Sequence, residues 1–133
     1  MRVLALDYGA ARTGVAVSDA TGTIAIPLEV VERASSPAGL TRIGQLVDEH
    51  GAERVVVGLP LTLRGDRGEQ ARRTEEFVRD LRERLDVPVE SYDERFTTAL
   101  AARAAGAAGA PEDARAAAHL LESYLAWTNT RPK

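Results

Sequence analysis

Residues 3–18 read VLALDYGAARTGVAVS, two apolar runs joined by a turn-forming segment, and this stretch decides the fold. The first run ends in Asp7, which Tyr8 and Gly9 follow, and the second run begins after Arg12. Asp ahead of Gly commonly opens a tight turn between two strands, so turn chemistry alone explains Asp7. A carboxylate at the tip of a buried strand is also costly to place, which makes Asp7 a candidate functional residue. Both interpretations remain open on this stretch alone.

Length and composition limit the possible functions. A chain of 133 residues suits one domain, 1–133, and without cysteine a metal site must use oxygen or imidazole ligands. The net charge of -3 gives no global basic field, so a nucleic-acid partner would need a local basic patch. The N-terminal apolar run is too short for a signal peptide, and residues 55–61 are too few to cross a bilayer. We therefore expect a cytoplasmic protein without membrane contact.

The first part of the chain predicts an antiparallel meander. Strands are expected over Leu4–Asp7, Gly14–Ser18 and Ile24–Val31, because apolar runs there are separated by turns rich in Gly, Asp and Thr. Pro27 cannot donate to a sheet and suits an edge better than a centre. The third strand is therefore the least regular of the three.

The rest of the chain alternates helices with strands. Apolar residues at helical spacing predict helices between Leu40 and Gly51, over Glu69–Leu85, over Thr98–Ala105 and over Glu112–Thr128. Two strands are expected between them, a wholly apolar central strand at Arg54–Leu59 and a last strand at Val87–Tyr92. Three antiparallel strands followed by a parallel β-α-β unit make an α/β domain with a mixed five-stranded sheet, flanked by helices.

Four acidic residues lie where these elements begin or end. Asp7 follows the first strand, Asp93 and Glu94 follow the last, and Asp113 lies in the first turn of the final helix. Ligands of open α/β sheets bind at the carboxyl ends of strands, and the acids converge there if the final helix crosses the sheet. Clustered carboxylates repel each other unless a divalent cation neutralises them, and oxygen ligands favour Mg²⁺ or Mn²⁺.

Each acid also has a structural explanation. Asp113 stabilises a helix N-terminus by about 0.3 to 1 kcal/mol. Asp93, Glu94 and Arg95 would form a solvated turn with an ion pair worth about 0 to 1 kcal/mol. Together these explanations require three coincidences of position, whereas one metal site accounts for all the acids.

Four segments resemble the YqgF (RuvX) family, in order and over nearly the whole chain. They are residues 6–19 (LDYGAARTGVAVSD), residues 57–61 (VGLPL) with Gly65, residues 93–98 (DERFTT), and residues 113–125 (DARAA, then LLESYL). Members of this family have the RNase H-like fold and are described as Holliday junction resolvases and as nucleases that mature pre-16S ribosomal RNA. The resemblance implies a divalent-metal-dependent endonuclease that acts on branched DNA, precursor rRNA or both.

The resemblance also implies the residues that hold the metal. Asp7, Glu94 and Asp113 would form the catalytic acidic triad, with Asp93 as a weaker ligand. One Mg²⁺ or Mn²⁺ ion, or two ions about 3.5 to 4 Å apart, would activate a water and stabilise the leaving oxygen of a phosphodiester. The product would keep a 5′-phosphate.

Phosphates need positive contacts, and the arginine fork suits them because it binds two phosphate oxygens at once. The best-placed arginines are Arg12 in the first turn, Arg64 and Arg67 in a Gly-flanked loop, and Arg95 beside the proposed ligand. The arginines of the 69–85 helix alternate with acids, which is typical of a solvated helix face.

Two further residues are candidates for substrate contact. Thr97 could bond a phosphate or, like Thr98, cap the next helix. Tyr8 could stack on a base or pack against the core. His119 is interpreted as a surface or packed histidine and not as a general base.

Two other functions fit parts of the sequence. The segment from Asp7 to Gly14 also resembles the first phosphate loop of actin and Hsp70-type ATPases, but that fold needs two lobes and this chain has room for one. A non-catalytic nucleic-acid-binding or ribosome-assembly factor would use the arginines alone, which leaves the three acids unexplained. Symmetric cutting of a junction would call for a twofold homodimer.

Overall fold

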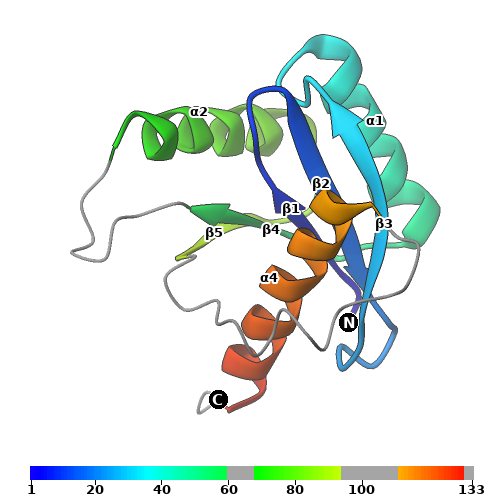
Figure 1. The fold of residues 1–133 in the computed structure, drawn as a ribbon. Coiled ribbons are helices and arrows are strands. Elements are labelled where there is room, and N and C mark those ends of the chain that lie inside the picture. The colour runs from blue at the N-terminus through cyan, green and yellow to red at the C-terminus, as the bar shows by residue number, and fades with distance from the viewer. Residues whose placement is uncertain (60–67, 94–110, 131–133) are drawn as a thin grey trace.

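A mixed five-stranded sheet forms the centre of the computed structural model, which describes residues 1–59, 68–93 and 111–130 (Figure 1). The strand order is β3-β2-β1-β4-β5; β1, β2 and β3 pair antiparallel, and β4 and β5 continue parallel to β1. This confirms the predicted fold class. The strands are β1 (Val3–Asp7), β2 (Arg12–Ser18), β3 (Ala25–Glu32), β4 (Arg54–Leu59) and β5 (Val89–Asp93).

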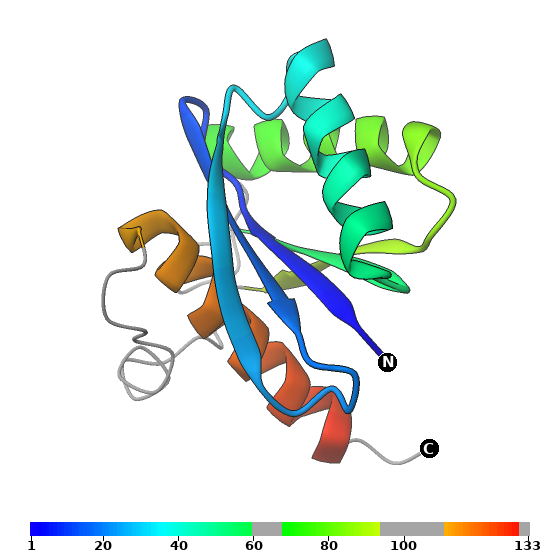
Figure 2. The same ribbon diagram turned by 90° about the vertical axis from the view of Figure 1, so that its right-hand side faces the viewer.

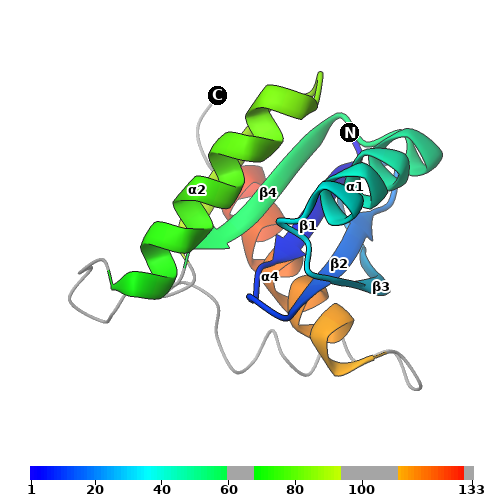
Figure 3. The ribbon, with the colours of Figure 1, turned by 90° about the horizontal axis from the view of Figure 1, so that it is seen from above.

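Helices cover the two faces of the sheet unequally. Helices α1 (Pro37–His50) and α2 (Glu69–Arg84) lie on one face, and α4 (Glu112–Thr130) crosses the other (Figure 1). Figure 2 shows α4 on the opposite side of the strands from α1 and α2. In Figure 3, α1 and α2 lie in front of the strands and α4 lies behind them. The sheet therefore separates two hydrophobic cores.

The sequence of β1 explains how one strand serves both cores. Leu4 and Leu6 pack in the core under α1 and α2, whereas Val3 and Ala5 pack in the core under α4. Side chains alternate between the faces of a strand, so Asp7 continues the Val3–Ala5 series toward the α4 face. The apolar spacing thus determines which face receives the first candidate acid.

Each element in the described ranges lies where the sequence predicts it, and the boundaries differ by up to three residues: β2 begins earlier, at Arg12, and β5 runs over Val89–Asp93 and not over Val87–Tyr92. Helix α1 begins at Pro37, ahead of Leu40, because the Ser36 hydroxyl accepts the backbone N–H of Gly39 at 3.1 Å and proline is well suited to the first helical turn. Pro27 lies in the edge strand β3, as predicted, beside a register irregularity of its pairing with β2. The helix predicted over Thr98–Ala105 lies outside the described residues.

None of the helices in the described ranges is both long enough and apolar enough to span a membrane.

Helix α4 is tethered to the parallel half of the sheet through the hydroxyl of Tyr124. This hydroxyl accepts a hydrogen bond from Arg54 Nη1 of β4 at 3.1 Å and donates one to Glu90 of β5. The Tyr124 side chain is 2% exposed, and burial, together with the bond to Glu90, raises its pKa. The tether connects the helix to β4, which pairs with β1, and to β5, which pairs with β4 at the edge of the sheet.

We expect Tyr124→Phe to lower the free energy of unfolding by about 1.5 to 3 kcal/mol, because the lost hydrogen bonds involve charged partners. Tyr92→Phe is the matched control, since its hydroxyl bonds the neutral Ser123 hydroxyl at 2.8 Å, and it should cost only about 0.5 to 1.5 kcal/mol. Urea unfolding of the three proteins measures both values. Equal losses in the two variants would contradict the charged tether.

Candidate functional site

Strands β1 and β2 and helix α4 meet closely at one glycine. Gly14 of β2 lies opposite Asp7 of β1 in the antiparallel register. A Cβ atom built on Gly14 would lie 1.8 Å from the backbone oxygen of Asp113 and 2.3 Å from its carbonyl carbon. The first turn of α4 therefore rests directly on the β2 backbone, at a distance that only glycine permits.

This close approach brings two of the predicted acids to one place. Residues directly opposite each other on antiparallel strands project their side chains to the same face. The missing Gly14 side chain would point at α4, so the Asp7 side chain also lies on the α4 face. Asp7 and Asp113 thus share one face at the carboxyl end of β1, as the acid positions predicted.

Arg12, the predicted phosphate contact, lies at the same end of the sheet. Its Nε atom is 3.3 Å from Asp113 Oδ2. The turn before it is tight: the Thr13 hydroxyl contacts both the backbone N–H and the carbonyl of Gly9 at 3.4 Å. The β1–β2 turn therefore holds Arg12 beside the start of α4.

Asp93 belongs to the other face of the sheet. In β5, Val89 packs in the α1–α2 core and Tyr92 packs in the α4 core. Alternation places Asp93 with Val89, on the face away from Asp113. Its role as a metal ligand remains a prediction, and this placement does not support it.

Five predicted site residues lie outside the described part of the chain, namely Arg64, Arg67, Glu94, Arg95 and Thr97. Over residues 1–59, 68–93 and 111–130, no three Asp, Glu or His side chains are grouped closely enough to hold a metal ion. Asp7 and Asp113 supply the oxygen donors that Mg²⁺ and Mn²⁺ prefer, but two carboxylates are only part of a ligand set. The donor chemistry fits a divalent cation and requires a further ligand.

Tyr8 packs against the core under α1 and α2. Its ring stacks on Phe77 with centroids 4.4 Å apart and an interplanar angle of 24°, and its hydroxyl lies 3.5 Å from the Ser35 hydroxyl. A cavity of about 300 Å³ adjoins the ring, between the β1–β2 turn and the start of α2. The packing role of Tyr8 is thus visible in the fold, and its contact with substrate remains a prediction.

Sequence reasoning did not single out Glu32, Arg33 and Glu112, which line the surface around Arg12. One cavity of about 430 Å³ is lined by Arg12, Val30, Glu32, Pro111, Glu112 and Asp113. An adjoining cavity of about 440 Å³ is lined by Ala11, Arg12, Glu32 and Arg33. For Glu32, the signal in the sequence was the pairing register of the antiparallel strands, because Arg12 of β2 lies opposite Glu32 of β3.

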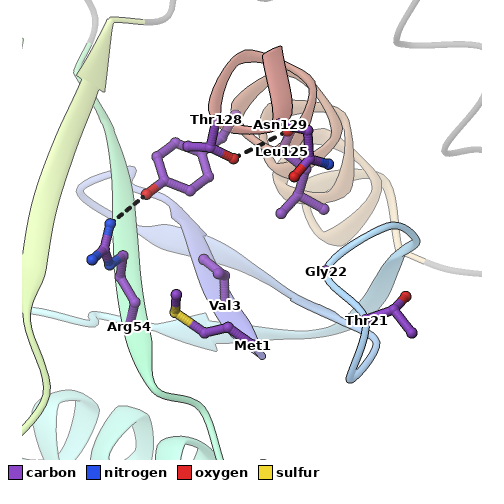
Figure 4. Close-up of a pocket in the computed structure, with 9 residues that line it drawn as sticks. Met1, Val3, Thr21, Gly22, Arg54, Leu125, Thr128 and Asn129 are labelled. Atoms are coloured by element: carbon purple, nitrogen blue, oxygen red, sulfur yellow. Dashed lines mark hydrogen bonds between the residues drawn. The ribbon is translucent and has the colours of Figure 1, made fainter. Parts of the chain in front are cut away.

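Another cavity, of about 350 Å³, lies at the opposite end of the sheet, where β1 and β4 begin (Figure 4). Arg54 stands on one side of it, and Leu125, Thr128 and Asn129 of α4 stand on another. The Arg54 guanidinium already bonds Tyr124 and Glu90. This cavity contains none of the predicted acids, so the carboxyl end of β1 is the better candidate for the functional site.

One flank of α4 carries charged groups in poorly solvated positions. Arg115 Nε, His119 Nε2 and Glu122 Oε1 are buried and have no hydrogen-bond partner among the described residues. Burial raises the pKa of Glu122; burial first, and then the charge of Arg115, lower the pKa of His119. The sequence left a surface or a packed histidine open at position 119, and the partly buried imidazole favours the packed one.

Fold and acid positions together define a class: an RNase H-like α/β protein with carboxylates at the carboxyl end of its first strand and at the start of its last helix. Solved structures of similar architecture include Thermus thermophilus RuvC, with a TM-score of 0.66, 17% identity and coverage of 97% of this chain and 96% of that one. A T. thermophilus RuvC in complex with a Holliday junction substrate gives a TM-score of 0.65 at 21% identity, with 97% and 95% coverage. These likenesses establish the fold.

The family follows from the sequence comparison. The RuvX family model, described as "Holliday junction resolvase", matches residues 1–127, and the chain belongs to this family. A Chloroflexus aurantiacus protein named "Putative pre-16S rRNA nuclease" is 41% identical over 137 aligned positions, covering 98% of this chain and 90% of that protein. A Desulforudis audaxviator protein of the same name is 50% identical over 99 positions, covering 74% and 70%. The family resemblance seen in the four sequence segments is thereby confirmed.

Gly14→Ala should lower the free energy of unfolding by about 1 to 3 kcal/mol, because the new methyl group forces α4 away from the sheet. Gly44→Ala in α1 is the matched control, since its Cβ would meet only Leu85 Cδ2 at 3.8 Å. That change should stabilise the protein by about 0.5 to 1 kcal/mol through helix propensity. Urea unfolding measures both; a Gly14→Ala protein as stable as the parent would contradict the close approach.

The buried carboxyl group of Glu122 should make stability fall as pH rises. Burial raises the pKa of Glu122 in the folded protein, so the unfolded chain loses this proton at a lower pH than the folded protein does. The free energy of unfolding therefore falls as the pH rises above the unfolded value of 4.5. Glu122→Gln should therefore gain stability over the parent at about pH 7 and show little gain near pH 4. Urea midpoints across this range measure the difference. Glu83→Gln is the control, because Glu83 is exposed. If Glu83→Gln gains stability between about pH 4 and pH 7 as much as Glu122→Gln does, the effect does not come from Glu122.

Proposed function

We propose that this protein is an endonuclease that hydrolyses phosphodiester bonds in structured nucleic acid. Membership of the RuvX family supports the proposal, and one structural observation carries it: Gly14 brings the start of α4 against β2, so that Asp113 joins Asp7 on one face of the sheet. Both carboxylates are partly exposed to solvent. A substrate phosphate can therefore reach them.

We propose that Asp7, Glu94 and Asp113 hold Mg²⁺ or Mn²⁺. When bound, the cation would lower the pKa of a water molecule and neutralise charge that develops on the phosphate oxygens. Glu94 is preferred to Asp93 as the third ligand because Asp93 lies on the face away from Asp113. Carboxylate oxygens are hard ligands, which agrees with the choice of cation.

The residues of the chain itself supply positioning and charge. Arg12 lies beside Asp113 and offers several N–H donors to a phosphate next to the carboxylates. Strand β1 and the first turn of α4 are held by sheet pairing and by packing, so the two acids rest on rigid elements. We propose that Arg64, Arg67, Arg95 and Thr97 extend the phosphate contacts, and that Tyr8 supports the turn and contacts substrate at its edge.

The substrate class is branched DNA, precursor ribosomal RNA or both. The family description names Holliday junction resolution, and the relatives' names specify pre-16S rRNA. Both substrates present phosphates around an irregular backbone, which acidic ligands and arginines recognise without reading base sequence. Paired cuts in a four-way junction would require two copies of the site, so for that substrate we propose a twofold homodimer.

The test is cleavage of a four-way DNA junction and a pre-16S rRNA fragment with Mn²⁺ or Mg²⁺. Asp7→Asn, Glu94→Gln and Asp113→Asn should each reduce the rate by at least about 100-fold, since loss even of outer-shell partners of metal ligands costs about 10 to 100-fold. Asp93→Asn is the matched control and should keep most of the activity. Unchanged cleavage by Asp7→Asn would contradict the metal site. Binding without cleavage by the parent protein would instead support a nucleic-acid-binding or ribosome-assembly factor.

A further inference from the structure

Arg12 and Asp113 are in contact, although the proposed function gives each of them a different partner. Arg12 Nε lies 3.3 Å from Asp113 Oδ2, and the two side chains are 66% and 38% exposed. An ion pair with this exposure is weak, worth about 0 to 1 kcal/mol, and forms and breaks readily in solution. The contact is therefore suited to exchange between partners and contributes little to the fold.

The surroundings of Arg12 explain why it pairs with this acid. The cavity around Asp113 is also lined by Glu32 and Glu112, and Arg12 is its one basic residue among the described residues. Three carboxylates and one guanidinium thus line this cavity, and the guanidinium contacts the carboxylate of Asp113. Because like charges repel, Arg12 lowers the cost of placing these acids together.

We infer that Arg12 exchanges partners during the working cycle of the site. It neutralises Asp113 when no divalent cation is bound, and it moves to a substrate phosphate when a cation takes that carboxylate. This inference rests on the proposed function. The Asp113 carboxylate then has a cationic partner both with and without a bound divalent cation. When the cation is bound it repels the Arg12 guanidinium, which has a phosphate anion within reach.

The exchange predicts a coupling between metal and nucleic acid. A cation that occupies Asp113 releases Arg12 for phosphate binding, and a phosphate that binds Arg12 releases Asp113 for the cation. Each ligand then raises the affinity for the other by the same factor, as linkage requires. Removal of Arg12 should strengthen cation binding in the absence of nucleic acid. It should also weaken the coupling between cation binding and nucleic-acid binding.

The first measurement is Mn²⁺ binding without nucleic acid, followed by electron paramagnetic resonance of free Mn²⁺. Arg12→Gln should bind Mn²⁺ about two- to fivefold more tightly than the parent, as expected from loss of a weak competing ion pair. Arg33→Gln is the matched control, because Arg33 is exposed, lines the adjoining cavity and does not line the cavity of Asp113. It should leave Mn²⁺ affinity unchanged.

The second measurement is the affinity for a non-hydrolysable four-way junction with and without Mn²⁺. The ratio of the two affinities is the coupling factor, and it should be smaller in Arg12→Gln than in the parent and in Arg33→Gln. Equal coupling factors in the three proteins would overturn the exchange. Unchanged Mn²⁺ affinity in Arg12→Gln, or the same increase in Arg33→Gln, would also overturn it.

Asp113→Asn separates this inference from the proposed function. If Asp113→Asn loses Mn²⁺ affinity while Arg12→Gln behaves like the parent, the metal site stands and the exchange fails. If the parent and Asp113→Asn bind Mn²⁺ equally, the proposed metal site itself fails, and the exchange fails with it.

Discussion

The contact between the β2 backbone at Gly14 and the first turn of α4 is the constraint on which the site depends. A side chain at this position would overlap the Asp113 carbonyl, so glycine is required for the helix to lie on the sheet. Gly14 also pairs with Asp7 of β1. One backbone position therefore determines how Asp7 and Asp113 lie relative to each other, although they are 106 residues apart in the sequence (from 7 to 113). The tether from Tyr124 to Arg54 and Glu90 holds the other half of the helix, and together the two contacts determine how α4 crosses the sheet.

Charge is distributed unevenly along this helix. Its first turn carries Glu112 and Asp113, which the helix dipole favours, and Arg12 offsets part of their charge. Farther along, burial disfavours the charged forms of His119 and Glu122. The exposed, charged end of α4 is thus the part suited to a cation and a phosphate, whereas burial disfavours charge on the flank that carries His119 and Glu122.

Local patterns were sufficient to predict the fold and part of the site. Apolar runs separated by turns predicted the antiparallel strands, the β-α-β pattern after them predicted the mixed sheet, and turn chemistry placed Asp7 and Arg12 at one end of it. The sequence could not show that Asp93 faces away from Asp113, because this depends on where the alternation of β5 begins. Nor could it identify Glu32 beside Arg12, since that neighbour follows from cross-strand register and a bulge in β3. Long-range register and the close approach at Gly14 are tertiary properties that periodicity does not encode.

Paramagnetic broadening of backbone amide signals by Mn²⁺, recorded by nuclear magnetic resonance on the intact protein, tests whether Asp7 and Asp113 share one cation. Substoichiometric Mn²⁺ should broaden the amides around Asp7, Gly14 and Asp113 together, because these three positions meet at one end of the sheet. Gly44 and Asn129, which lie in α1 and at the far end of α4, should keep sharp signals. Broadening centred elsewhere, or on Asp7 without Asp113, would contradict a shared cation site built on Gly14.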